Sequence, residues 1–141
     1  LIELGYLVGP GSPVTTITDV DRPGIRIGVT GGGTSNSVLA RQFKNAAVVP
    51  AETIHMAIDM LSQQKIDAYA TTKANLYAMS DSIPGSRVLD GRWGLERLAM
   101  AFPKGRGAGM EYVNAFVADI KANGLVARAS ERVGLRGAVK E

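Results

Sequence analysis

Residues 25–44 read IRIGVTGGGTSNSVLARQFK, and within this stretch a strand pattern changes into a helix pattern. Apolar side chains alternate with others over 25–29, as they do in a strand with one buried face. Glycines fill 31–33, and the Thr-Ser-Asn run at 34–36 can then cap a helix that reaches from 37 to 44. A strand, a glycine loop and a helix in this order form the opening unit of a parallel α/β sheet.

The same alternation continues to about residue 90. Short apolar runs bounded by turn residues predict strands, and apolar residues at helical spacing predict the helices between them. The expected order is strand 47–49, helix 51–65, strand 66–70, a helix that begins at Thr71-Thr72, and strand 86–89. We therefore expect an α/β fold with a small, mostly parallel sheet that helices flank on both faces.

The two ends of the chain add strands and helices to this sheet. A short apolar run at Tyr6–Val8 stops at the breaker cluster Gly9–Pro13, which predicts a strand and a turn. After the sheet, we expect a strand over Leu95–Phe102. Two helices follow, over 109–123 and 125–133.

Composition excludes several classes of protein. The chain has 141 residues, no cysteine and one histidine, His55, so disulfides, thiolate catalysis and a histidine metal cluster are ruled out. The net charge is +3 without a cluster of basic and aromatic residues, which argues against nucleic-acid binding. No apolar run is long enough to span a membrane, and residues 1–20 lack the features of a signal peptide. We expect no metal and no cofactor.

The glycine loop is the sharpest candidate for a ligand site. Glycines let a ligand approach the backbone, and the start of the next helix adds a partial positive charge, a combination that suits an oxyanion. The candidate residues are Thr30, Gly31, Gly32, Gly33, Thr34 and Ser35. The alternative is a tight strand-to-helix turn without a ligand. The loop matches neither nucleotide fingerprint, since no Lys follows Gly33 and Asn stands at position 36.

A second candidate follows the strand at 66–70. Thr71, Thr72 and Lys73 offer two hydroxyls and one cation at the carboxyl end of that strand, where ligands of parallel sheets bind. The alternative is that Thr71 or Thr72 caps the next helix. His55 lies off the apolar stripe of its helix and is expected in solvent. Trp93 is expected to pack in a half-buried position.

The order of these segments resembles family-three extracellular solute-binding proteins, the receptors of ABC importers for amino acids and related solutes. The segment 6–14 is similar to the first crossover strand of that family, and 19–29 to the entry into the second lobe. The runs 57–61 and 65–70 resemble a helix and strand of the second lobe, and 98–105 the returning crossover strand. The resemblance implies the lobe of a type II periplasmic-binding-protein fold, in the periplasm or outside the cell.

This resemblance divides the chain into three parts. Residues 1–24 would be a hinge strand and connector, 25–92 the ligand-binding lobe, and 93–141 a returning strand and helices that belong to the first lobe. Members of the family carry roughly 100 further residues upstream, about one domain. Family members that bind amino acids place an Asp near the position of Thr72, which here cannot supply a charge.

The resemblance implies passive binding of a small, polar solute, and the glycine loop favours an anionic one, either amino-acid-like or an organic acid. Its partners would be the solute and the membrane subunits of an ABC transporter. We expect no catalytic residue. One alternative is an enzyme of the same fold, like cyclohexadienyl or arogenate dehydratases. Another is a truncated, non-binding, oligomeric remnant. We also expect a homo-oligomer, because the helix at 109–123 has an apolar face without a partner in the chain.

Overall fold

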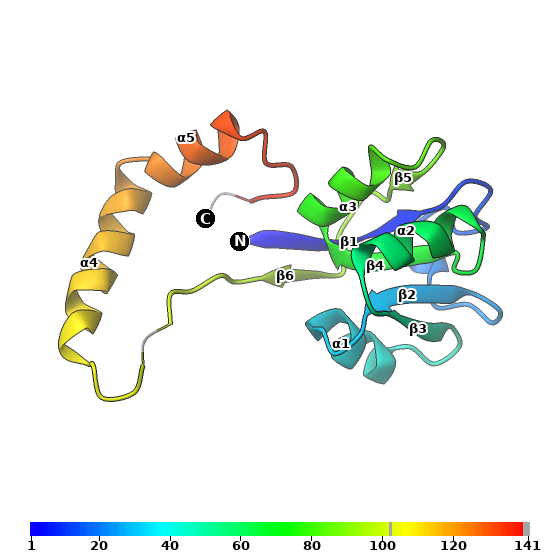
Figure 1. The fold of residues 1–141 in the computed structure, drawn as a ribbon, viewed down its shortest axis with the longest axis horizontal. Coiled ribbons are helices and arrows are strands. Elements are labelled where there is room, and N and C mark those ends of the chain that lie inside the picture. The colour runs from blue at the N-terminus through cyan, green and yellow to red at the C-terminus, as the bar shows by residue number, and fades with distance from the viewer. Residues whose placement is uncertain (102, 140–141) are drawn as a thin grey trace.

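The structure, a computed structural model, describes residues 1–101 and 103–139. Its strands and helices alternate along most of the chain, as Figure 1 shows. The elements are β1 (Ile2–Val8), the short 3-10 helix η1 (Ile17–Asp19), β2 (Arg26–Thr30), α1 (Thr34–Gln42), β3 (Ala47–Ala51), α2 (Ile54–Ser62), β4 (Ala68–Thr72), α3 (Lys73–Ser80), β5 (Arg87–Val88), β6 (Gly94–Glu96), α4 (Ala108–Ala122) and α5 (Leu125–Arg132).

One mixed sheet organises the described residues. The strand order is β3-β2-β4-β1-β5. β6 pairs with the first half of β1, on the same side of β1 as β5, which pairs with its last two residues. β2 pairs in parallel with β3 and β4, whereas β1 runs antiparallel to β4, β5 and β6. The strands other than β1 therefore share one direction. Consequently the carboxyl ends of β2, β4 and β6 lie at the same end of the sheet, together with the beginning of β1.

Side chains from both faces of the sheet form the core. On one face, Ile27 and Val29 pack in a buried cluster with Leu39 of α1. On the other face, Leu7 and Tyr69 are buried with residues of α2 and α3. Neighbouring residues of one strand thus point into different clusters, as the pleat requires. The predicted arrangement of a sheet between two helical layers is confirmed.

The unit at 25–44 differs from the expectation at its helix start. α1 begins at Thr34 with Gly33 as its N-cap, not at Ser37. Gly32 adopts a positive φ of 71°, and the Gly33 amide donates to the Thr30 carbonyl oxygen at 3.1 Å, so the turn is complete within the glycines. The expected capping run at 34–36 therefore forms the first turn of the helix itself.

Other element bounds shift by a few residues. β3 runs through Pro50 to Ala51, which an edge strand allows because the missing N–H removes no bond from a central ladder. β4 spans Ala68–Thr72 where 66–70 was expected, and β5 keeps two residues. The strand expected from Leu95 is limited to Gly94–Glu96. Its predicted end at Phe102 lies outside the described residues.

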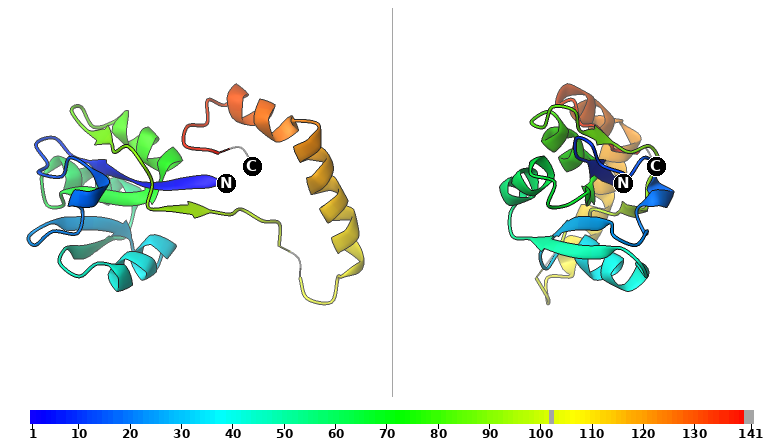
Figure 2. Two further views of the ribbon diagram at one scale, coloured as in Figure 1. Left: turned by 180° about the vertical axis from the view of Figure 1, so that it is seen from behind. Right: turned by 90° about the vertical axis from the view of Figure 1, so that its right-hand side faces the viewer.

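The C-terminal helices extend away from the sheet as an arm, which is clear in Figures 1 and 2. Where the structure describes their side chains, α4 and α5 bury none of them. The chain then returns to the sheet: the Glu3 amide donates to the Gly137 carbonyl at 2.9 Å, and the Val139 amide to the Leu1 carbonyl at 3.0 Å. The arm is thus attached to the sheet at both ends. Within the described residues, no helix has the length and apolar character to cross a membrane.

Candidate functional site

A pocket of about 200 Å³ opens at the end of the sheet where the carboxyl ends of β2, β4 and β6 lie. It collects segments that are far apart in the sequence. Its lining residues are Leu4, Thr30, Gly33, Thr34, Ser35, Thr71, Thr72 and Glu96. The structure therefore brings together most of the polar residues that the sequence singled out. Gly31, Gly32 and Lys73 are not among the residues that line it.

The first turn of α1 forms one wall of this pocket. Its N-cap, Gly33, has no side chain that could accept a hydrogen bond from the turn. Within the described part of the chain, no acceptor is found for the backbone amides of Thr34, Ser35 and Asn36. Free amides and the helix dipole at this end favour a negatively charged group. The Ser35 hydroxyl adds a further donor beside them.

The glycine loop itself has a more structural part than expected. The Gly31 amide donates to the Ala51 carbonyl at 3.0 Å, and the Gly33 amide is engaged by Thr30. Gly31 and Gly32 are exposed, and Gly32 provides the positive φ of the turn. The loop thus shapes the turn and presents α1. Among the residues that line the pocket, the donors are amides at the helix start and hydroxyl groups.

The two threonines at the ends of β2 and β4 are both held in place. Thr30 Oγ1 lies 2.8 Å from the Tyr69 hydroxyl, in a bond where either atom can be the donor. Thr72 is the N-cap of α3, and its Oγ1 accepts from the Asn75 amide at 3.5 Å. The capping interpretation of Thr72 is therefore confirmed, and the same residue also lines the pocket.

Lys73 lies away from the pocket. It is 8% exposed, and its Nζ forms a 2.8 Å ion pair with Glu3 Oε2. Its aliphatic part crosses Gly5 of β1, where an added Cβ would lie 3.0 Å from Lys73 Cγ. Hydrogen bonds from Lys73 and then Arg92 lower the pKa of Glu3 below its ordinary value. The cation that the sequence assigned to the ligand is instead committed to a structural ion pair.

Glu96 is a pocket residue that the sequence analysis missed. It is partly buried at the end of β6, where it pairs with Ile2 of β1. Strand alternation places it on the same face as Leu4, which pairs with Gly94 and also lines the pocket. Among the described residues, no hydrogen bond or ion pair to its carboxylate is found. An acidic residue in a crossover segment was visible in the sequence, but its pairing register was not.

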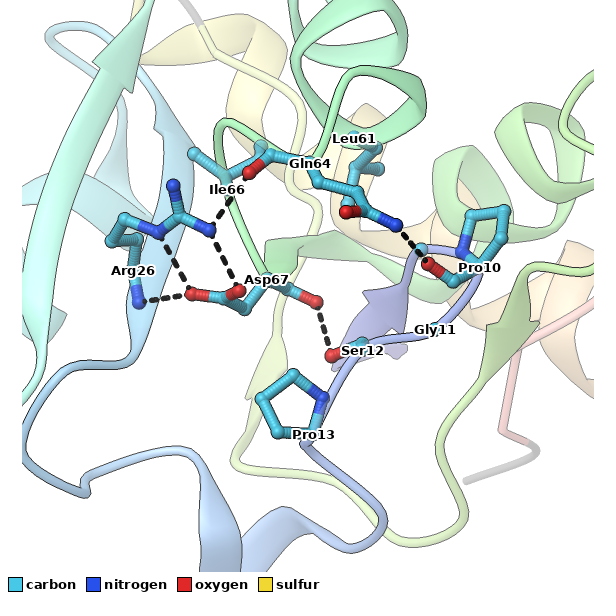
Figure 3. A pocket seen from close by; sticks show the side chains of 10 residues that line it. Pro10, Gly11, Ser12, Pro13, Arg26, Leu61, Gln64, Ile66 and Asp67 are labelled. Carbon is cyan, nitrogen blue, oxygen red and sulfur yellow. Dashed lines mark hydrogen bonds and ion pairs between the residues drawn. The ribbon is translucent and has the colours of Figure 1, made fainter.

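A second pocket, of about 230 Å³, lies at the opposite end of the sheet, between the turn after β1 and the start of β2. Figure 3 shows that its polar groups bond to one another. Asp67 accepts from the Arg26 amide at 2.8 Å and from Arg26 Nε at 3.0 Å, and Ser12 Oγ donates to the Asp67 carbonyl at 2.7 Å. Because these groups are already paired, this pocket is a weaker candidate for a ligand site.

The remaining chemically interesting residues lie outside the pocket. His55 is exposed on α2, as expected. Trp93 is half-buried: its Nε1 donates to the Gly5 carbonyl at 3.1 Å, and its ring centroid lies 6.2 Å from that of Tyr6. The packing role expected for Trp93 is confirmed. In the described parts of the chain, no cluster of His, Asp or Glu is suited to hold a metal ion.

Comparison with solved structures identifies the fold. A putative binding component of an ABC transporter from Wolinella succinogenes, complexed with lysine, matches at TM-score 0.80 and 24% identity, over 93% of this chain and 58% of that chain. An ancestral arginine-binding protein bound to glutamine matches at TM-score 0.76 and 21% identity, over 97% and 60% of the two chains. No protein-family model matches the sequence, and no curated protein is significantly similar to it in sequence.

A third match has the same fold. It is an ancestral amino-acid-binding protein described as a precursor of cyclohexadienyl dehydratase, with TM-score 0.74 and 20% identity over 93% of this chain and 57% of that chain. The chain thus spans less than two thirds of the length of these structures. Together they show that it has the type II periplasmic-binding-protein fold, as the sequence resemblance implied.

Proposed function

We propose that this chain binds a small, polar, amino-acid-like solute in the pocket at the carboxyl ends of β2, β4 and β6. The observation that carries the proposal is the convergence of hydroxyls, helix amides without an acceptor in the described residues, and one carboxylate in a single pocket. Type II binding proteins that match the fold include structures in complex with lysine and with glutamine. Ligands of open α/β sheets bind beyond the carboxyl ends of the strands.

The chemistry of the wall at α1 supports a carboxylate on the solute. The amides of Thr34 and Ser35, which have no partner in the described chain, and the Ser35 hydroxyl are donors, and the helix end adds a partial positive charge. This part of the pocket fits the anionic group that the sequence suggested. The carboxylate at Glu96 makes a purely anionic solute a poor match for the pocket as a whole.

We further propose that the chain acts as part of a receptor for an ABC importer in the periplasm or outside the cell. In that assembly, residues 25–92 would be one lobe, 1–24 a hinge strand, and 93–141 elements of the other lobe. A second lobe would close over the pocket by hinge motion. The membrane subunits of the importer would be its partners. Residues 1–141 by themselves form only one side of such a cleft. We therefore expect them to bind the solute with a Kd above about 1 μM, which corresponds to a binding free energy weaker than about −8 kcal/mol.

The role of the α1 wall is tested by comparing two serines of the same helix. Ser35 lines the pocket, whereas Ser37 is exposed outside it. Ser35→Ala removes one donor to the solute carboxylate, so affinity for L-glutamine or L-lysine falls about threefold to tenfold. Ser37→Ala leaves affinity unchanged. Titration calorimetry of both variants decides the matter, and equal affinity in both would argue against a ligand at this wall.

An enzyme of the same fold is the second candidate, and Glu96 is the observation that favours it. A carboxyl group in a ligand pocket can serve as a general acid or base. The match to a precursor of cyclohexadienyl dehydratase points to prephenate and arogenate as substrates to try. Turnover of either compound that is lost in Glu96→Gln would replace passive binding by catalysis.

A further inference from the structure

We propose that Glu96 makes the pocket selective for solutes that carry a positively charged side chain several bonds from their carboxylate. This inference rests on the proposed function and specifies its substrate class. Among the described residues that line the pocket, Glu96 alone carries a charge. Two cationic side chains close to β1, those of Lys73 and Arg92, both pair with Glu3, at 2.8 and 2.9 Å.

The order of the strands separates the start of α1 from Glu96. β4 and β1 lie between β2, which leads into α1, and β6, which carries Glu96. Thr71 and Thr72 of β4 and Leu4 of β1 therefore form the floor, with the helix end on one side and the carboxylate on the other. Three strand spacings separate β2 from β6, roughly 14 Å between strand axes. Side chains from both sides shorten that gap.

This arrangement fits an elongated solute with opposite charges at its two ends. The carboxylate of the solute meets the amides and dipole of α1, and an ammonium or guanidinium group meets Glu96. A partly enclosed wall strengthens the attraction of Glu96 for a cation compared with bulk water. A neutral side chain leaves the carboxylate facing only water and hydroxyls. Selectivity therefore comes from β6, a segment outside the glycine loop.

The test uses L-lysine and L-6-hydroxynorleucine, which differ only in an ammonium or a hydroxyl at the end of the side chain. Binding of each is measured by amide chemical shifts for the full chain and for two variants. Glu96→Gln removes the charge in the pocket and keeps the shape of the side chain. Glu111→Gln is the matched control, because it makes the same change of charge on the exposed surface of α4.

We expect the unchanged protein and Glu111→Gln to bind L-lysine at least about tenfold more tightly than L-6-hydroxynorleucine. In Glu96→Gln, affinity for L-lysine falls to that of the hydroxyl analogue, whose own affinity stays the same. Equal binding of both solutes by all three proteins overturns the role of Glu96 and leaves solute binding intact. If neither solute binds to any of the three proteins, the proposed function and this selectivity are overturned together.

Discussion

At the scale of single residues, Arg26 and Asp67 form an ion pair in which both carboxylate oxygens are engaged. The Arg26 side chain donates to both carboxylate oxygens, at 3.0 and 2.9 Å, and its backbone amide adds a third bond at 2.8 Å. Burial raises the pKa of Asp67, but the hydrogen bonds and charge of Arg26 outweigh it, so the pKa is lowered overall. The pair connects the start of β2 to the residue before β4.

This lowered pKa predicts a dependence of stability on pH. A carboxyl whose pKa is lower in the folded state stabilises the fold fully above its unfolded pKa, about 3.9 for Asp, and less as pH falls below it. Asp67→Asn is therefore expected to lower the free energy of unfolding by about 1–3 kcal/mol at pH 7. The difference in the free energy of unfolding between Asp67→Asn and the unchanged protein becomes smaller towards pH 3. Urea unfolding at both pH values measures it.

A nearby exposed carboxylate serves as the control for this prediction. Asp59 lies on the exposed side of α2, so Asp59→Asn is expected to change the unfolding free energy little at either pH. A gap between Asp67→Asn and the unchanged protein that is as large at pH 3 as at pH 7 would mean that the pair does not depend on ionised Asp67.

At the scale of elements, local patterns predicted the strand, glycine turn and helix over 25–44 because period and turn residues are local signals. The start of α1 was misplaced, since a turn closed by Gly33 and Thr30 made a capping side chain unnecessary. Pro50 was taken as a strand end, which holds for central strands but not for β3 at the edge.

The pocket was predicted only where it follows local rules. Thr30, Ser35 and Thr72 stand at strand ends and helix starts, so the sequence pointed to them directly. Lys73 also follows a strand, but its side chain lies across Gly5 of β1, where it pairs with the carboxylate of Glu3. Glu96 reaches the pocket through the pairing of β6 with β1, residues more than 90 positions away. Such long-range register cannot be read from local patterns.

At the scale of the whole molecule, a compact lobe carries an arm whose apolar residues face solvent. Tyr112 is 75% and Phe116 42% exposed on α4, and Val133 after α5 is 72% exposed. Exposed apolar surface of this kind favours association with another protein surface. We propose that copies of this chain associate through α4 and α5 when no other partner covers the arm.

Light scattering combined with size exclusion measures this association. We expect a mass above that of one 14.8 kDa chain, and a shift towards that mass when Tyr112→Lys and Phe116→Lys are combined. Neither side chain is buried in the single chain, so the double variant should keep its fold. A monomer at every concentration tested would refute association through the arm, without bearing on the pocket.

The central claim, that the pocket at the carboxyl ends of β2, β4 and β6 holds a solute, is tested most directly by mapping where L-lysine binds. Nitrogen-15-labelled chain is titrated with L-lysine to millimolar concentration, and amide shifts are followed residue by residue. We predict that the largest changes occur at Ser35, Thr72 and Glu96, with small changes at Ser12 and Gln64 of the opposite pocket. Changes centred on Ser12 and Gln64, or no saturable change at all, would contradict the account.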